Sequence, residues 1–533
     1  MARLKEYNGH YCESEYEYAF IGFLEAEGWK YSSGNNIRRV TKRDVLIADD
    51  FKKFIADTNP DLTEDEVTQI YDNVRLVGAE SDFATLHKVY GWMVNGVQFT
   101  QQDGLPRMIP LIDFDNWDKN IFRVVNQFTV EYTNNGQKEN RRPDVLLFVN
   151  GMPLCVVELK NPANANATIY DAWEQINIRY WRDIPHLLHY CPLACISDGV
   201  KTRLGTVRTP YEHFYAWRRV TERDAVSTLP FAETETMIKG VYAPERFLEI
   251  FRDYIYFQDS IYDSDEVEIV CRYPQFFAAR LLKQSIIKSV VEKSGKGGTY
   301  FGATGCGKTY TMAFLARQLA LRCIDIPEIG SPTIILIVDR DELQKQGSKL
   351  FTKSKEFLNL GEVSVVKNRT QLRQELGARQ SGGFYICTIQ KFCDREDDKI
   401  GLINDRQNII CFSDEAHRTQ EHSKKIQFSK DADENMKAMV SKPYAKVLKE
   451  AFPHATFVGF TGTPIAETYQ TFGDEIDRYT MDQAVADGLT VSIKYHPRIA
   501  KVLLDNKKVK EIENYYKKCA DDGATYEDIE ASK

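Results

Sequence analysis

A chain of 533 residues is long enough for several domains with their own hydrophobic cores, which excludes a peptide-sized module. Hydrophobic residues make up 43% and charged residues 27% of the sequence, and these shares exclude a collagen-like or broadly disordered chain. The net charge of −8, from 69 Lys and Arg against 77 Asp and Glu, does not by itself indicate a nucleic-acid-binding protein, although it would not reveal a basic groove.

The N-terminal sequence and the cysteines bear on the compartment in which the protein works. Residues 1–6 lack the apolar core of a signal peptide, and no apolar run reaches the roughly 18 residues of a membrane-spanning helix. Several of the 11 cysteines, such as Cys155 and Cys411, lie in apolar stretches, which favours reduced core thiols over a disulfide framework. We expect a cytoplasmic protein without a membrane partner.

The first 260 residues predict a mixed α/β unit. An amphipathic helix is predicted before Gly28, because apolar residues recur at helical spacing at Tyr16, Ala19, Phe20, Phe23 and Leu24. Between residues 121 and 160, short β-rich runs predict a small antiparallel sheet, and Asn150-Gly151 is typical of a tight hairpin turn. A helix over 170–180 and a strand over 193–196 follow.

The hairpin in this unit brings together three residues that suit metal-dependent phosphodiester cleavage. Glu158 and Lys160 are two apart on one strand and therefore face the same side, and the hairpin can bring Asp144 alongside them. Asp144 and Glu158 would hold Mg²⁺, while Lys160 would orient or activate a water near the scissile phosphate. This pattern resembles the PD-(D/E)xK nuclease core, and a charged edge strand is the alternative interpretation.

A second group of potential ligands lies just beyond. His186, His189, Cys191 and Cys195 are spaced more tightly than the ligands of a paired-loop zinc site, and they lead into an apolar strand. We expect core residues here rather than a zinc centre.

A charged passage around residues 262–266 precedes a second unit of the α/β class. Helix-length segments separate candidate strands, as a parallel sheet requires, at Thr299–Phe301, Thr333–Val338, Phe384–Thr388, Ile409–Phe412 and Thr456–Phe460. After about residue 470, too little chain remains for another complete α/β domain.

The first of these strands leads into a phosphate-binding loop, residues 302–309, with the sequence GATGCGKT. It fits the Walker A pattern between a strand and a helix. Lys308 would reach the β- and γ-phosphates of ATP, and the Thr309 hydroxyl would bind Mg²⁺. The backbone would curl around the phosphates at Gly302, Thr304, Gly305 and Gly307. Cys306 is a small residue that the loop tolerates.

About a hundred residues later, the strand Ile409–Phe412 ends in an acidic pair. Asp414 would hold the nucleotide's magnesium through water, and Glu415 would polarise the attacking water. Such a pair alone is usually a solvated loop, but after a Walker A loop it indicates nucleotide hydrolysis.

The run Asp-Glu-Ala-His over 414–417 resembles motif II of superfamily 2 helicases and translocases. Other segments resemble that family's motifs in the same order. Residues 272–275 resemble the adenine-reading element, which assigns base binding to Gln275. Residues 338–343 and 388–390 match backbone-contacting motifs, and residues 460–464 match motif III.

Residues 141–162 closely resemble the nuclease segment of type I restriction enzyme motor subunits, in which a nuclease precedes a DEAH-type motor. The resemblance implies double-stranded DNA as substrate, methyltransferase and specificity subunits as partners, and S-adenosylmethionine held by those partners. An additional acidic residue would come from Glu13 or Glu17, although a solvated helix face is the expected alternative. The family's glutamine and tyrosine are four residues apart, whereas Gln175 and Tyr180 are five apart, so only Gln175 is carried over, weakly.

The resulting hypothesis has three parts: a restriction-endonuclease-like domain over 1–260, a RecA-like P-loop domain over 261–470, and the beginning of a second RecA-like lobe over 471–533. The arginines of a second lobe have no candidate, so we expect this chain alone to bind ATP without translocating DNA. Lys and Arg should be concentrated on grooves that face DNA. Two alternatives remain: a repair or remodelling helicase with a non-cleaving N-terminal domain, and a non-enzymatic assembly module.

Overall fold

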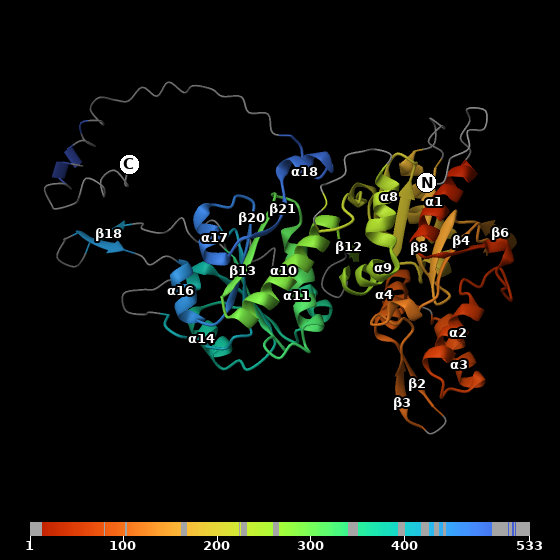
Figure 1. Cartoon of the computed structure of the whole chain (residues 1–533), viewed down its shortest axis with the longest axis horizontal. Helices are drawn as coiled ribbons and strands as arrows, with labels where there is room; N and C mark the ends of the chain where they lie inside the picture. Colours follow the sequence, from red (N-terminus) through yellow and green to blue (C-terminus); the bar gives the residue numbers. More distant parts are fainter. Residues whose placement is uncertain are drawn as a thin grey trace. The chain divides into compact units, whose positions relative to one another are not determined.

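The computed structural model describes residues 13–78, 80–101, 104–160, 168–222, 224, 232–258, 266–338, 350–392, 400–416, 426–430, 436–440 and 444–492, together with 510, 514, 515, 517 and 518. The chain forms two compact units, Met1–Thr490 and Val491–Lys533. All elements below belong to the first unit, which is of the α/β class (Figure 1). Within these described ranges, none of the helices combines the length and the apolar character needed to cross a bilayer.

A six-stranded mixed sheet is the centre of the N-terminal part. Its strands, in spatial order, are β1 (Lys30–Ser33), β4 (Phe122–Asn126), β7 (Val145–Val149), β8 (Met152–Leu159), β9 (Leu193–Ser197) and β10 (Thr202–Thr206). The predicted antiparallel strands are present as β4, β7 and β8. The sheet is larger than predicted, because β1 joins β4 and β9 joins β8 in parallel.

The turn between β7 and β8 has the predicted conformation. Asn150 and Gly151 have φ angles of 51° and 77°, both in the left-handed region. A Cβ on Gly151 would lie 2.3 Å from the carbonyl oxygen of Ile47, so this position also demands close backbone approach. Every residue of β7 and β8 is buried, which explains why these strands lack polar alternation.

Helices and small hairpins surround this sheet. The predicted first helix is α1 (Glu13–Ala26), with Phe20 and Leu24 buried. The other helices are α2 (Ala48–Thr58), α3 (Glu64–Arg75), α4 (Asp82–Asn95), α5 (Ile169–Glu174), α6 (Trp181–Asp183), α7 (Pro185–Leu188), α8 (Glu233–Met237) and α9 (Pro244–Asp253), with π-helical turns at Gln175–Tyr180 and Ile238–Tyr242. The hairpins are β2 (Val97–Thr100) with β3 (Pro106–Ile109), β5 (Val130–Asn134) with β6 (Gln137–Arg141), and β11 (Ile255–Gln258) with β12 (Val267–Val270).

The second sheet has seven parallel strands. They are, in spatial order, β15 (Val363–Val365), β16 (Phe384–Thr388), β14 (Thr333–Val338), β17 (Ile409–Asp414), β20 (Thr456–Thr461), β13 (Lys296–Gly302) and β21 (Glu475–Tyr479). All five predicted strands are present, and their parallel pairing is confirmed. The predicted boundary at residue 470 falls inside this domain, because β21 pairs in parallel with β13.

Helices α10 (Tyr273–Glu292) and α11 (Lys308–Arg322) lie side by side, and α10 packs against β13 (Figure 1). The remaining elements are α13 (Lys355–Leu358), α14 (Arg369–Gly377), α16 (Tyr444–Ala451), α17 (Ala466–Phe472), α18 (Met481–Ala486) and the hairpin β18 (Ile426–Lys430) with β19 (Met436–Val440). We call residues 13–271 the N-terminal domain and residues 272–490 the P-loop domain. The β11–β12 hairpin is assigned to the N-terminal domain because the Thr206 hydroxyl of β10 donates to the Glu268 carbonyl of β12.

Candidate functional site

The three residues predicted for metal-dependent cleavage lie together at one end of the central hairpin. Asp144 directly precedes β7, and its Oδ2 accepts a hydrogen bond of 2.8 Å from the backbone N–H of Leu159. Glu158 is near the end of β8, and its Oε2 lies 3.8 Å from Lys160 Nζ. The hairpin therefore brings Asp144, Glu158 and Lys160 together, as the sequence predicted.

The environment of Glu158 disfavours its charge. The side chain is fully buried, and this burial together with the negative charge of Asp144 raises the pKa of the Glu158 carboxyl well above its usual range. Glu158 Oε2 is a buried atom without a hydrogen-bond partner in the described part of the chain. A carboxylate oxygen left open beside a second carboxylate fits the oxygen ligands that Mg²⁺ prefers.

At this site the described residues offer two carboxylates as metal ligands, those of Asp144 and Glu158. Among these residues, no group of three or more His, Cys, Asp or Glu side chains is placed to hold a metal ion. This is compatible with magnesium, which keeps several waters and is usually bound through one or two carboxylates.

A π-helical turn brings Tyr180 into the cluster, although its spacing from Gln175 in the sequence did not predict this. Lys160 Nζ donates to Gln175 Oε1 at 3.0 Å, and Gln175 Nε2 donates to the Tyr180 hydroxyl at 2.8 Å. The Tyr180 hydroxyl donates to Glu158 Oε1 at 2.5 Å. Residues five apart face the same side in a π-helix, so the extra residue between Gln175 and Tyr180 is absorbed by the turn at Gln175–Tyr180.

The expectation that Glu17 lies on a solvated helix face was wrong. Glu17 is only 5% exposed, because α1 packs this side chain against the end of β4. Its two carboxylate oxygens accept hydrogen bonds from Asn126 Nδ2 at 2.5 Å and Gln127 Nε2 at 2.8 Å. The backbone N–H of Gln127 donates to the carbonyl of Asp144, so Glu17 adjoins the cluster. The side chain of Glu13 lies outside the described residues.

The four potential zinc ligands have separate surroundings. His189 Nε2 lies 2.9 Å from Asp82 Oδ1 on α4, and burial lowers the pKa of His186 to about 4. Cys191 and Cys195 are buried, and burial raises the pKa of both thiols.

The phosphate-binding loop has the strand, turn and helix that its sequence predicts. It begins at Gly302, the last residue of β13, and α11 starts at Lys308. Gly305 and Gly307 have φ angles of 82° and 86°, a conformation that favours glycine. Lys308 Nζ donates to the carbonyl of Gly302 at 3.3 Å, so its ammonium group lies over the loop. Thr309 is the second residue of α11 and therefore lies in the first turn of the helix.

Asp414 and Glu415 lie at the carboxyl end of β17. In the same parallel sheet, β20 lies between β17 and β13. Burial raises the pKa of Asp414 to about 6, although the charge of Lys308 acts in the opposite direction. Glu415 has a φ angle of 48°, and its backbone N–H donates to Asp414 Oδ1 at 3.0 Å. The parallel sheet thus brings the acidic pair to the edge that carries the phosphate-binding loop.

Gln275 has a different environment from the one expected of a base-reading residue. It is 3% exposed, its Oε1 accepts from the backbone N–H of Arg272 at 2.9 Å, and its Nε2 donates to the carbonyl of Gly307 at 3.4 Å. In this structure Gln275 therefore caps α10 and braces the phosphate-binding loop.

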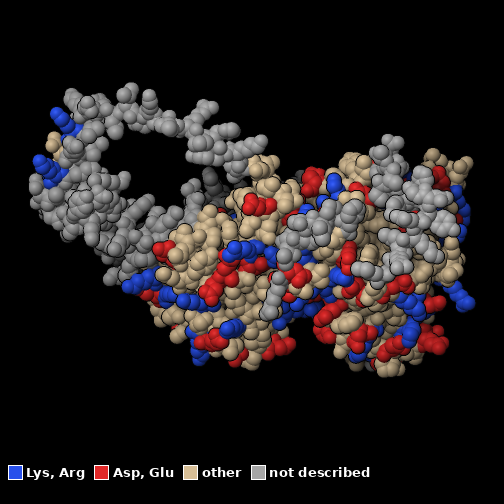
Figure 2. All heavy atoms as spheres, turned by 45° about the horizontal axis from the view of Figure 1, so that its top comes forward, with Lys and Arg blue, Asp and Glu red and all other residues tan. Residues whose placement is uncertain are grey.

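The remaining motif segments are partly described. Residues 388–390 begin at the last residue of β16. Residues 460–464 run from the end of β20 to a point beside the loop, where a Cβ on Gly462 would lie 3.4 Å from the carbonyl oxygen of Gly302. Residues 339–343 and His417 lie outside the described residues. On the face in Figure 2, Lys and Arg are interspersed with Asp and Glu, so this face does not show the expected concentration of basic side chains.

Two family models match the chain. Residues 11–213 match the model described as the N terminus of type I restriction enzyme R proteins. Residues 274–527 match the model described as SWI2/SNF2 ATPase.

Curated relatives agree with these matches. The type I restriction enzyme HindI endonuclease subunit of Haemophilus influenzae is 31% identical over 511 residues, which cover 91% of this chain and 46% of that protein. The type I restriction enzyme SauCOLORF180P endonuclease subunit of Staphylococcus aureus is 26% identical over 403 residues, 73% of this chain and 38% of that protein. The chain thus spans less than half the length of these two relatives.

Among solved structures, the ATP-dependent Type ISP restriction-modification enzyme LlaBIII bound to DNA has 16% identity and a TM-score of 0.28. The match covers 43% of this chain and 17% of that one.

Proposed function

The chain belongs to the family of type I restriction enzyme endonuclease subunits, and from this premise we propose that it couples Mg²⁺-dependent DNA cleavage to an ATP-driven motor. The observation that carries the cleavage proposal is the cluster that the buried Glu158 forms with Asp144 and Lys160. We assign the N-terminal domain a restriction-endonuclease-like core, the P-loop domain a RecA-like fold, and residues 491–533 to a second motor lobe.

In the proposed cleavage site, Asp144 and Glu158 would hold Mg²⁺, which when bound would supply Lewis-acid activation of the scissile phosphate and of a water. Glu158 must lose its proton before it can act as a ligand, because burial raises its pKa. Tyr180 donates to the other carboxylate oxygen and so fixes the orientation of Glu158. Gln175 holds the Lys160 ammonium group beside the site, where it orients the water or the phosphate.

In the proposed motor site, backbone N–H groups of residues 302–309 surround the ATP phosphates, and Lys308 moves from the Gly302 carbonyl to the β- and γ-phosphates. Thr309 and Asp414 hold the magnesium of the nucleotide, Asp414 through water. Glu415 orients the attacking water. Gln275 positions the loop, and to contact the adenine its amide would exchange the hydrogen bonds with Arg272 and Gly307 for bonds to the base.

The substrate that we propose is double-stranded DNA, which the motor would pull toward the complex before the nuclease cuts. Methyltransferase and specificity subunits are the proposed partners and would carry S-adenosylmethionine and the recognition of the DNA site. A cytoplasmic location agrees with these partners.

A plasmid-nicking assay with Mg²⁺ tests the cleavage site. Lys160→Ala and Glu158→Ala should each abolish nicking, while Lys201→Ala, a basic residue elsewhere in the same domain, should not. The cleavage proposal fails if the first two variants nick like the parent.

Equilibrium binding of MgATP tests the nucleotide site. Lys308→Ala should lower the affinity about 10- to 100-fold, because charge-assisted hydrogen bonds to phosphate contribute about 1.5–3 kcal/mol. Unchanged affinity in Lys308→Ala would remove the basis for the motor proposal.

A further inference from the structure

A continuous series of hydrogen bonds and ion pairs joins the proposed cleavage site to the phosphate-binding loop. It runs through the interior of the N-terminal domain, crosses to the P-loop domain at one arginine, Arg218, and ends on the strand next to the loop. Each link is an observed contact.

On the nuclease side, the series begins at the backbone of Lys160, whose N–H donates to the carbonyl of Ser197 on β9 at 2.8 Å. The Ser197 hydroxyl lies 2.8 Å from the Thr202 hydroxyl on β10 and 2.7 Å from the Tyr16 hydroxyl on α1. The backbone N–H of Thr202 donates to Glu233 Oε2 at 3.0 Å, so the path on this side ends at the Glu233 carboxylate.

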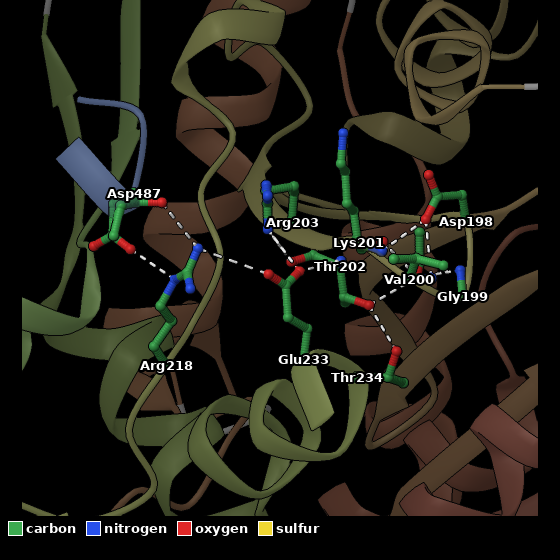
Figure 3. A network of polar contacts seen from close by, with 12 residues as sticks. Asp198, Gly199, Val200, Lys201, Thr202, Arg203, Arg218, Glu233, Thr234 and Asp487 are labelled. Atoms are coloured by element: carbon green, nitrogen blue, oxygen red, sulfur yellow. Dashed lines mark hydrogen bonds and ion pairs between the residues drawn. The ribbon is translucent and has the colours of Figure 1, made fainter. Parts of the chain in front are cut away.

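Arg218 bridges two acidic side chains (Figure 3). Its Nη2 lies 3.8 Å from Glu233 Oε1, and its Nε lies 2.6 Å from Asp487 Oδ1. Glu233 is also held by Arg203 Nη1 at 2.8 Å. The side chains of Arg218 and Glu233 are both 12% exposed and that of Asp487 is 8% exposed, so solvent screens these ion pairs weakly.

On the side of the P-loop domain, Asp487 directly follows α18. Its side chain contacts the start of α10 and the end of β21, the strand beside β13. Its Oδ2 accepts hydrogen bonds from the hydroxyl of Tyr273 at 2.8 Å and from that of Tyr479 at 2.6 Å. Tyr273 begins α10, the helix that carries Gln275. The carbonyl of Tyr479 accepts from the backbone N–H of Ala303, inside the phosphate-binding loop, at 2.8 Å.

Other contacts hold the two domains together independently of Arg218. Arg219 Nη1 lies 3.1 Å from Asp477 Oδ1 on β21. The guanidinium of Arg272 stacks on the ring of Tyr215, 3.5 Å from its centroid, and also donates to its hydroxyl. Loss of Arg218 therefore removes the link between the sites while the docking of the domains is retained.

We propose that Arg218 couples nucleotide binding in the P-loop domain to the geometry of the cleavage site, with Glu233 and Asp487 as its two anchors. The inference rests on the proposed function, since it takes the nucleotide to bind at residues 302–309. A nucleotide that shifts Ala303 moves Tyr479 and Asp487, and Arg218 transmits this movement to Glu233, β10 and the backbone of Lys160. Such coupling is measured as a change at one site caused by ligand binding at the other.

Hydrogen–deuterium exchange of the whole chain, with and without MgADP, measures this coupling at the amides that form the path. In the parent, MgADP should slow exchange at residues 302–309 and also at Lys160 and Thr202. In Arg218→Gln, the protection at residues 302–309 should remain, while the effect at Lys160 and Thr202 should fall at least about fivefold, the lower end of typical allosteric coupling. Arg75→Gln is the control, because Arg75 pairs with Asp44 at 3.2 Å within the N-terminal domain.

Asp487→Asn breaks the same ion pair from the motor side, while Arg218 Nη2 keeps its hydrogen bond of 3.3 Å to the carbonyl of Ala486. This variant should lower the effect at Lys160 and Thr202 in the same direction, so the test does not depend on one variant folding. Protection at residues 302–309 without a response at Lys160 and Thr202 in the parent overturns the coupling and leaves the proposed nucleotide site intact. An undiminished response in Arg218→Gln also overturns it. If MgADP protects no residue of the loop in the parent, the proposed nucleotide site fails and the coupling fails with it.

Discussion

Replacement of Glu158 by glutamine tests whether this buried carboxyl is a metal ligand. In the metal-free protein the folded-state pKa of Glu158 is raised, so the stability that its protonated form contributes is fully present below the unfolded pKa of about 4.3 and is lost as pH rises through the folded pKa. Glutamine stays neutral at every pH. Glu158→Gln should therefore become more stable than the parent as pH rises, by up to about 1.4 kcal/mol per pH unit in this window.

Magnesium should reverse this difference in the parent alone. A ligand that binds only the folded state stabilises it by about 1.4 kcal/mol at ten times its dissociation constant and by about 2.7 kcal/mol at a hundred times. Because glutamine lacks the charge that Mg²⁺ requires, Glu158→Gln should gain little of this stabilisation. The advantage of the variant in EDTA at pH 8 should shrink or change sign in Mg²⁺.

The chain offers both a selective probe and a matched control. All six tryptophans lie between residues 29 and 217, so urea unfolding followed by tryptophan fluorescence reports on the N-terminal domain. Glu268 is 4% exposed, burial raises its pKa well above the usual range, and neither carboxyl oxygen has a hydrogen-bond partner among the described residues. Glu268→Gln should show the same pH-dependent gain without any dependence on Mg²⁺.

Equal stabilisation of the parent and Glu158→Gln by Mg²⁺ would refute the assignment of Glu158 as a ligand. A loss of Mg²⁺ stabilisation in Glu268→Gln would show that the effect follows from removing any buried carboxyl, and would refute the reasoning in the same way. Magnesium bound in the P-loop domain contributes equally to all three proteins and cancels in the comparison.

Three further predictions follow from single contacts. Tyr180→Phe removes the hydroxyl that Glu158 accepts from, so Mg²⁺-dependent plasmid nicking should slow about 10- to 100-fold while the circular dichroism spectrum stays unchanged. Because the pKa of Asp414 is raised to about 6, MgADP affinity measured by calorimetry should fall up to about tenfold per unit as pH drops below 6, and Asp414→Asn should show no such dependence. Gly151→Ala should destabilise the N-terminal domain by about 1–3 kcal/mol in urea unfolding, and more than Gly136→Ala, since both have positive φ but only Gly151 faces backbone atoms within 3 Å.

Features encoded in short segments were predictable from the sequence. The glycines of residues 302–309 have the positive φ angles that their spacing requires, and Asn150-Gly151 forms the predicted hairpin turn. All five candidate strands of the P-loop domain are present and parallel, because buried strands of such a sheet are continuous apolar runs. The short strand β15 and the polar strand β21 carry no such signal and were missed.

The candidate cleavage cluster was only partly predictable. Asp144, Glu158 and Lys160 follow from hairpin geometry, which is set by nearby residues. The role of Tyr180 was hidden, because an α-helix would turn a residue five positions from Gln175 away from it, and only the π-helical turn aligns them. The sequence around Glu17 predicted an exposed side chain, but packing of α1 against β4 buries it.

The sequence by itself determined which side chains are the candidates to bind phosphate, magnesium and water, and on which strand or turn each one lies. Only the tertiary structure decided how those groups are connected, as in the link between Arg218 and Asp487, 269 positions apart in the chain. The physical reason is that backbone propensities and side-chain periodicity act over a few residues. Burial, pKa shifts and ion pairs between domains depend on which distant segments pack together.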